Sequence, residues 1–287
     1  MNMNTRTISV LIPAYNASKY IDDCVLSILK QSFYDFEMVI IDDNSSDGTY
    51  KKLLGYQRID PRVRVFKNDI NLGIAGNRNK AVSLSKGKYI VWQDADDIAL
   101  ENRLSTLFNY MEANPDIGIC GSSIEIFDER GGGSIRSYPL TDSEIRRALY
   151  RYSPIAQPSA IVRSDILKRV GLYDLKYPPA EDLDMTFRIG MLSRLANVGE
   201  VLLRYRENPS SATFTKQRRM EICTLAIRNK YKDSKYYNFS VGDLVFNLLH
   251  KVSLYVIPSS LKHSIFSMIR DKPLSKIKMI NTCEDKK

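Results

Sequence analysis

The sequence predicts an α/β fold in which a mostly parallel sheet is flanked by helices and followed by a C-terminal helical extension. In the first half of the 287-residue chain, short runs rich in β-branched and aromatic residues alternate with segments of helical spacing. This alternation is typical of the βαβ units of a parallel sheet. After residue 215 only helical periodicity remains. The hydrophobic composition of 44% is enough for a proper core.

Four strands are expected in the first half, at residues 8–12, 36–42, 63–67 and 88–92. The first crossover carries an apolar face of Ile21, Val25 and Ile28, for which Asn16 or Ser18 is available as the helix N-cap. Two further crossover helices are expected to begin near positions 45 and 75.

The second half is expected to open with a helix over residues 101–113 and a strand over residues 117–127. An irregular segment with several prolines follows, as far as Ile166. A helix from Glu181 to about Leu195 and a strand over residues 198–206 complete the predicted core.

Residues 216–287 form a basic tail. They hold 15 Lys/Arg against 6 Asp/Glu, whereas the rest of the chain is balanced at 27 of each. Apolar residues recur every four positions from Leu244 to Val256 and from Leu261 to Ile269, which predicts two amphipathic helices. Such helices pack on a protein core or lie on an anionic membrane surface, and the sequence leaves both open. Because the excess charge is confined to the tail, no nucleic-acid partner is expected.

Several classes of protein are disfavoured by what the sequence lacks. No G-x-G-x-x-G follows the first strand and no G-x-x-x-x-G-K-[ST] occurs, which argues against dinucleotide-binding and P-loop proteins. Two histidines and four scattered cysteines supply no zinc cluster, and they suggest a reducing, cytoplasmic location. Pro13 and Asn16 interrupt the N-terminal apolar run, so no secretion signal is expected. No window reaches the roughly 18 apolar residues of a membrane-spanning helix.

Polar residues follow each of the four expected strands. Asn16 follows the first, Asp42 and Asp43 end the second, Asn71 follows the third and Asp94 the fourth. Ligands of open α/β sheets bind at the carboxyl ends of the strands. The sequence therefore predicts a binding site along this edge.

The stretch WQDADD, residues 92–97, favours a nucleotide diphosphate as the ligand. Asp94 and Asp96 can project from one tight turn, and a hard divalent cation prefers such oxygen ligands. So few carboxylates leave coordination positions open for phosphate oxygens. Glycoside hydrolysis is a competing hypothesis for the reaction, but it needs two carboxyl groups opposite each other.

Transfer from a nucleotide diphosphate needs a single carboxylate base on another element. Glu181 and Asp182, at the start of a predicted helix, meet that requirement. Asp42 and Asp43 are candidates to accept hydrogen bonds from the nucleobase, and Arg78 is a candidate to bind nucleotide oxygens.

Five motifs in order, ISVLIPAYNASKYIDDCVLSILKQS, VIIDDNSSDGT, NLGIAGNRNKA, WQDADD and AEDLDMTFR, resemble family-2 glycosyltransferases of the GT-A fold, whose sheet is Rossmann-like. The resemblance covers roughly residues 7–210. It implies a catalytic domain over residues 1–215, with nucleotide-sugar binding in about residues 1–100. Residues 101–215 would then form the acceptor side and supply the base, and residues 216–287 would be the basic helical tail.

The resemblance also implies roles for single residues. Pro13, Tyr15 and Asn16 match the motif lining the nucleotide pocket, Asp43 matches the aspartate at the nucleobase with Asp42 beside it, and Arg78 matches the basic residue near the nucleotide. Asp94 and Asp96 match the D-x-D motif: Asp94 would reach the ribose or the metal, and Asp96 would coordinate Mn²⁺ or Mg²⁺. Asp182 matches the catalytic base, and Glu181 is a less favoured substitute.

This chain departs from the family pattern in two places. The Q-x-x-R-W signature of processive synthases is missing, since residues 217–220 read QRRM, so a single sugar is expected per encounter. Relatives often carry a histidine just after a Tyr-Arg pair, where this chain has Glu207 and Asn208.

Together these observations lead to the expectation of an inverting hexosyltransferase for surface polysaccharide: O-antigen, capsule or lipooligosaccharide. It would move a hexose or N-acetylhexosamine from a UDP-sugar to a glycan or polyprenyl-diphosphate-linked oligosaccharide. The expected place is the inner face of the cytoplasmic membrane, with peripheral contact through the tail. The alternatives are transfer to polyprenyl phosphate and a non-catalytic sugar-nucleotide-binding subunit of a glycan-assembly complex.

Overall fold

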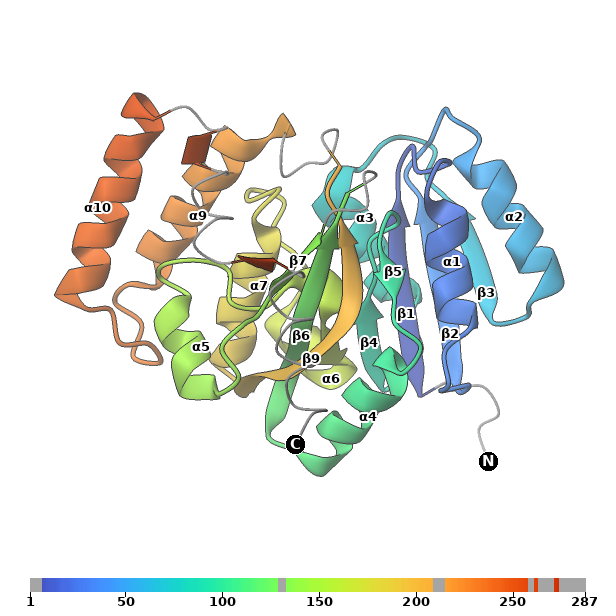
Figure 1. The fold of residues 1–287 in the computed structure, drawn as a ribbon, viewed down its shortest axis with the longest axis horizontal. Coiled ribbons are helices and arrows are strands. Elements are labelled where there is room, and N and C mark those ends of the chain that lie inside the picture. The colour runs from blue at the N-terminus through green and yellow to red at the C-terminus, as the bar shows by residue number, and fades with distance from the viewer. Residues whose placement is uncertain (1–6, 129–132, 209–214, 258–260, 263–270, 274–287) are drawn as a thin grey trace, which may run out of the picture.

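A computed structural model of the chain describes residues 7–128, 133–208, 215–257, 261–262 and 271–273 (Figure 1). Its sheet has the strand order β10-β7-β6-β8-β4-β1-β2-β3, with β9 paired to β5 and β6. The parallel part comprises β1 (Ile8–Ala14), β2 (Phe36–Asp42), β3 (Val63–Lys67) and β4 (Tyr89–Trp92). These are the four strands that the sequence predicts. Since β1 is paired with both β2 and β4, the chain reverses its direction of winding beside β1, where ligands of such sheets bind.

Helices cover both faces of the sheet. One face carries α1 (Ile21–Leu29), α2 (Thr49–Ile59) and α4 (Arg103–Ala113). The other carries α3 (Gly73–Leu84), α5 (Asp142–Ala148), α6 (Ser164–Val170), α7 (Glu181–Gly190) and α9 (Gln217–Tyr231). All seven residues of β2 are buried, as expected for a strand covered on both faces.

The second half extends the sheet with mostly antiparallel strands. They are β5 (Ile98–Ala99), β6 (Ile117–Phe127), β7 (Gly133–Arg136), β8 (Ile161–Arg163), β9 (Arg194–Arg206) and β10 (Asp271–Pro273), and a short 3-10 helix, η1 (Gln157–Ser159), precedes β8. The long strand β9 runs parallel to β6 with several register shifts, and its end pairs with β5 directly after WQDADD. The strand β9 thereby carries Arg206 to the expected site.

Two sequence-based expectations about helix ends are wrong. The helix expected to reach about Leu195 ends at Gly190, because Leu195 already pairs with Ile119 in the sheet. Neither Asn16 nor Ser18 caps α1, whose N-cap is Tyr20 without a side-chain cap. Both residues instead contact the loop after β2: the Ser18 N–H donates to Asp47 Oδ2 at 2.9 Å, and the contacts of Asn16 are described below.

The tail packs on the core through α9. Cys223, Ile227 and Tyr231 are buried in the cluster that also contains α7. Gly190 at the end of α7 lies so close to the tail that an added Cβ would clash with the Tyr237 hydroxyl oxygen. The next helix, α10 (Val241–Val256), lies at one end of the molecule in Figure 1, with α2 at the other. The second amphipathic helix, expected at Leu261–Ile269, falls almost wholly outside the described residues.

Candidate active site

The loops after β1 and β2 are bonded to each other. Asn16 adopts a left-handed conformation with φ 48°, which asparagine tolerates better than most residues. Its backbone N–H donates to Ser45 Oγ at 2.9 Å, and its Oδ1 accepts from the Ser46 N–H at 2.9 Å. Pro13 is partly buried and Tyr15 is 56% exposed, so the Tyr15 ring is available to a ligand at this edge.

Asp42 and Asp43 are both buried at the end of β2. The Asp43 carboxylate accepts hydrogen bonds from Asn68 Nδ2 (2.6 Å) and from the backbone N–H groups of Leu72 (2.8 Å) and Gly73 (2.9 Å). It therefore anchors the start of α3, because the first N–H groups of a helix have no partner within the helix. This structural task was not anticipated from the sequence. A contact of either aspartate with a nucleobase stays a prediction.

Arg78 connects the two halves of the predicted site. Its Nη1 donates to Glu181 Oε1 at 2.7 Å, and its Nη2 lies 3.4 Å from Asp94 Oδ1. The side chain is only 6% exposed, with its guanidinium 5.6 Å from the centre of the Trp92 ring. Burial acts to lower the pKa of Arg78, but Glu181 and Asp94 outweigh it and raise the pKa. Arg78 thus brings together elements that the sequence separates by about a hundred residues.

The aspartates of WQDADD have different environments. Asp94 and Asp96 are partly exposed, whereas Asp97 is fully buried and its Oδ1 accepts from the Arg206 N–H at 2.8 Å. Burial, and then the neighbouring Asp94 carboxylate, raise the pKa of Asp96 to about 6. Crowding of carboxylates destabilises their charged forms, and a bound cation would relieve that repulsion.

The donor set fits a hard divalent cation such as Mn²⁺ or Mg²⁺, because Asp94 and Asp96 offer only oxygen. Within the described ranges, no group of three or more His, Cys, Asp or Glu side chains is arranged to hold a metal ion. Two carboxylates would therefore leave most coordination positions to water and to a ligand's phosphate oxygens.

Two residues beside the aspartates were not among the sequence-based candidates. Arg206 Nε donates to the Asp96 carbonyl oxygen at 2.9 Å, and its guanidinium lies 4.6 Å from the centre of the Tyr20 ring. A hydrogen bond from the Asn208 side chain acts to lower the pKa of Asp96. The sequence feature that could have identified both residues is the Tyr205-Arg206 pair at the end of the predicted strand. A strand that ends there brings the polar side chains that follow to the same edge of the sheet as the aspartates.

The two base candidates differ in access. Glu181 is 1% exposed and its Oε1 is bonded to Arg78. Asp182 is only partly buried, and its Oδ1 accepts from the Leu183 N–H at 2.8 Å. Burial raises the pKa of Asp182, while Arg78 opposes the shift. The accessible carboxylate is therefore Asp182, at the first turn of α7.

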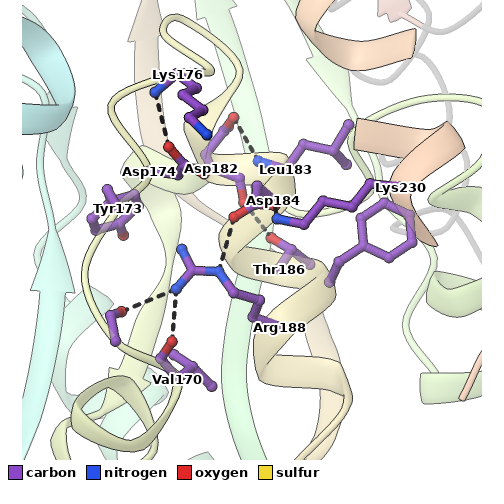
Figure 2. A network of polar contacts seen from close by, with 12 residues as sticks. Val170, Tyr173, Asp174, Lys176, Asp182, Leu183, Asp184, Thr186, Arg188 and Lys230 are labelled. Atoms are coloured by element: carbon purple, nitrogen blue, oxygen red, sulfur yellow. Dashed lines mark hydrogen bonds and ion pairs between the residues drawn. The ribbon is translucent and has the colours of Figure 1, made fainter. Parts of the chain in front are cut away.

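Asp184, two residues further along α7 than Asp182, ties this helix to the tail (Figure 2). It is fully buried and accepts hydrogen bonds from Arg188 Nε (2.8 Å), Lys230 Nζ (2.8 Å) and the Tyr231 hydroxyl (2.9 Å). Lys230 and Tyr231 belong to α9. The helix that carries Asp182 is therefore held in place by the first helix of the tail.

Replacing Asp184 by Asn is expected to lower the free energy of unfolding by about 2–3 kcal/mol. Removing one partner of a buried ion pair costs about 3–5 kcal/mol, and the 40% exposure of Lys230 reduces that figure. Chemical denaturation measures the change. The matched control is Asp165→Asn, an exposed residue in the first turn of α6, which should stay within about 0.5 kcal/mol of the parent chain. Equal stability of the two variants would contradict the anchoring role of Asp184.

Two open cavities lie beside the start of α7. One of about 500 Å³ is lined by Leu175, Pro178 and the start of α9, with Lys216, Arg218 and Arg219. A second of about 170 Å³ lies between the same segment and the first turn of α3. The walls of the larger cavity combine apolar and cationic side chains, so it suits an anionic ligand with an apolar part.

Comparison with known proteins gives a consistent result. The model of "Glycosyl transferase family 2" matches residues 9–171. An uncharacterized glycosyltransferase of Haemophilus influenzae is 31% identical over 266 residues, which cover 88% of this chain and 81% of the relative. WfgD of Escherichia coli, the UDP-Glc:alpha-D-GlcNAc-diphosphoundecaprenol beta-1,3-glucosyltransferase, is 26% identical over 91% of this chain and 97% of its own length.

Solved structures show the same fold. Residues 1–349 of Staphylococcus aureus TarS in complex with UDP-GlcNAc superpose with a TM-score of 0.68 at 20% identity, covering 86% of this chain and 73% of that one. The mannosyltransferase PcManGT of Pyrobaculum calidifontis, in complex with GDP-Man and Mn²⁺, gives 0.61 at 17% identity, covering 99% and 81%. The GT-A fold class predicted from the sequence is confirmed.

Proposed function

The chain belongs to glycosyl transferase family 2, and from this premise we propose that it transfers one hexose or N-acetylhexosamine from a UDP-sugar to a glycan acceptor with inversion. The observation that carries the proposal is the pair of contacts from Arg78 to Asp94 and Glu181. They place the donor-side loop and the start of α7 at one edge of the sheet. This arrangement supports a carboxylate base on the acceptor side of the proposed nucleotide site.

In the proposed reaction, Asp182 takes the proton of an acceptor hydroxyl as that oxygen bonds to the anomeric carbon. The bond between this carbon and the diphosphate breaks, and UDP leaves with the electron pair. A single displacement inverts the configuration. Asp94 and Asp96 would hold the Mn²⁺ or Mg²⁺, which when bound offsets the negative charge of the diphosphate.

For the acceptor we propose a lipid-linked glycan of a surface polysaccharide. WfgD, by its name, acts on a GlcNAc-diphosphoundecaprenol, and it aligns along nearly the whole of this chain. The cationic and apolar cavity at Leu175, Arg218 and Arg219 suits a diphosphate with a lipid attached. None of the helices within the described ranges is long and apolar enough to cross a membrane.

The test is a screen of nucleotide sugars for thermal protection, with and without Mn²⁺. A ligand at a hundred times its Kd stabilises the folded state by about 2.7 kcal/mol. We expect one UDP-sugar to raise Tm, and to do so only with the metal. Transfer to undecaprenyl-diphosphate-linked saccharides then identifies the acceptor, and NMR of the product reports the anomeric configuration. Protection by a non-nucleotide sugar alone would refute the proposal.

The same experiment separates the two alternatives. Transfer to undecaprenyl phosphate itself would identify a polyprenyl-phosphate glycosyltransferase. Protection by a UDP-sugar without turnover on any acceptor would indicate a non-catalytic subunit.

A further inference from the structure

The helix α10 is amphipathic with its polar side inward. Its buried or partly buried face contains Asp243, Asn247 and His250. Arg151 Nε donates to Asp243 Oδ1 at 3.1 Å, and Asn247 Nδ2 donates to the Tyr150 carbonyl oxygen at 3.2 Å. The helix is thus fastened to the core largely by polar contacts, the reverse of a surface helix that packs through its apolar stripe.

The outward face of α10 is apolar. Its exposed members are Val241, Leu244, Val245, Leu248, Leu249, Val252, Tyr255 and Val256, with exposures of 50–78%. At 100° per residue these eight side chains span one continuous arc of about 140°. Lys251, the one exposed charged residue of α10, lies at the edge of this arc. A continuous apolar face of this kind marks an interaction surface. We call these eight residues the α10 face.

The charge of the tail that carries this face favours one kind of partner. Among the described residues of the tail, seven exposed side chains are basic and one, Asp233, is acidic. The basic ones are Lys216, Arg218, Arg219, Lys230, Lys232, Lys235 and Lys251. Two copies meeting through their α10 faces would bring like charges together, whereas an anionic leaflet attracts them.

We propose that the α10 face inserts into the headgroup region of an anionic membrane, with the helix lying in the plane of the surface. A helix of 16 residues is about 24 Å long and too short to cross a hydrocarbon core of about 30 Å. Its apolar arc and the exposed lysines and arginines of the tail match the two contributions to interfacial binding, apolar burial and attraction to anionic lipid. This deepens the proposed function, because it would hold the enzyme at the surface where a lipid-linked acceptor lies.

The test uses the full chain and vesicles of phosphatidylcholine with or without phosphatidylglycerol. The parent chain should co-sediment with the anionic vesicles and bind the neutral ones at least tenfold more weakly. The variant Val245→Ser/Leu248→Ser/Leu249→Ser/Val252→Ser should lose at least tenfold in binding to anionic vesicles. The matched control, Leu26→Ser/Tyr34→Ser/Ile59→Ser, removes exposed apolar side chains away from α10 and should bind like the parent.

A second measurement holds even if the quadruple variant fails to fold. A fluorophore on Leu249→Cys should shift to the blue on anionic vesicles, and one on Ile59→Cys should not. Both variants also carry Cys283→Ser, which removes the fourth native cysteine as a labelling site. The other three, Cys24, Cys120 and Cys223, are buried. Equal behaviour of the two labels would overturn the proposal, as would a dimer that the quadruple variant abolishes without any vesicle binding. Donor protection by a UDP-sugar is measured separately, so failure here leaves the proposed transferase activity intact.

Discussion

Replacing Asp182 by Asn is expected to lower kcat about 10²–10⁴-fold, the range that a positioned general base contributes. Affinity for the UDP-sugar should hold, because Asp182 is proposed to act on the acceptor hydroxyl. Steady-state transfer assays give kcat, and calorimetry gives the donor Kd. A variant that transfers at the parent rate would remove Asp182 from the mechanism.

Glu181→Gln is the matched control for Asp182. Glu181 accepts from Arg78 and is almost completely buried, so its replacement should act mainly on stability and on the position of Arg78. Abolished turnover in Glu181→Gln with activity retained in Asp182→Asn would reverse the two roles.

The pH dependence gives an independent check on the base. Burial raises the pKa of Asp182 above its usual value of 3.8. As the proposed base, Asp182 would work deprotonated, so the rate should fall as the pH falls through this raised pKa. That acid limb should disappear from the residual activity of Asp182→Asn.

Asp96→Asn is expected to weaken binding of the UDP-sugar in the presence of Mn²⁺ at least tenfold, or about 1.4 kcal/mol. Removing one of the two carboxylates of the proposed cation site lowers the negative charge that would hold the metal. Electron paramagnetic resonance reports free and bound Mn²⁺ directly, without turnover. Calorimetry with and without EDTA gives the donor affinity.

Asp97→Asn is the neighbouring control for Asp96. Asp97 is fully buried, and an asparagine at this position retains an acceptor for the Arg206 N–H. Donor affinity should therefore stay within about threefold of the parent, or about 0.7 kcal/mol. Loss of Mn²⁺ binding in Asp97→Asn but not in Asp96→Asn would reassign the metal ligands.

The first half of the fold was predictable because its signals are local. The strands around Val10, Val39 and Val91 are short and buried on both faces, so their composition alone identifies them. The strands β5, β7, β8 and β10 were not predicted, since runs of two to four residues are too short to show an alternating pattern. The extent of β9 was missed as well. Leu195 looks like the end of a helical stripe, and only its pairing with β6 assigns it to the sheet.

The contacts of the candidate site were likewise only partly predictable from the sequence. That Asp94, Arg78 and Glu181 meet followed from strand ends and motif order, and the structure brings the three together. The bonds of Asp43 to the start of α3, and of Asp184 to Lys230, depend on packing between distant segments. Polar residues with such tasks look the same in sequence as ligand-binding ones.

The ion pair of Arg78 and Glu181 has a consequence for exchanging parts between related transferases. The two residues come from opposite sides of the 100/101 boundary between the expected donor and acceptor regions. Consider a chimera of residues 1–100 of this chain and the later residues of a relative. It would keep Arg78, but the residue at position 181, where Arg78 needs a buried carboxylate, would come from the relative. Any recombination of sugar donor and acceptor specificities in this scaffold must therefore move position 78 and position 181 as one unit.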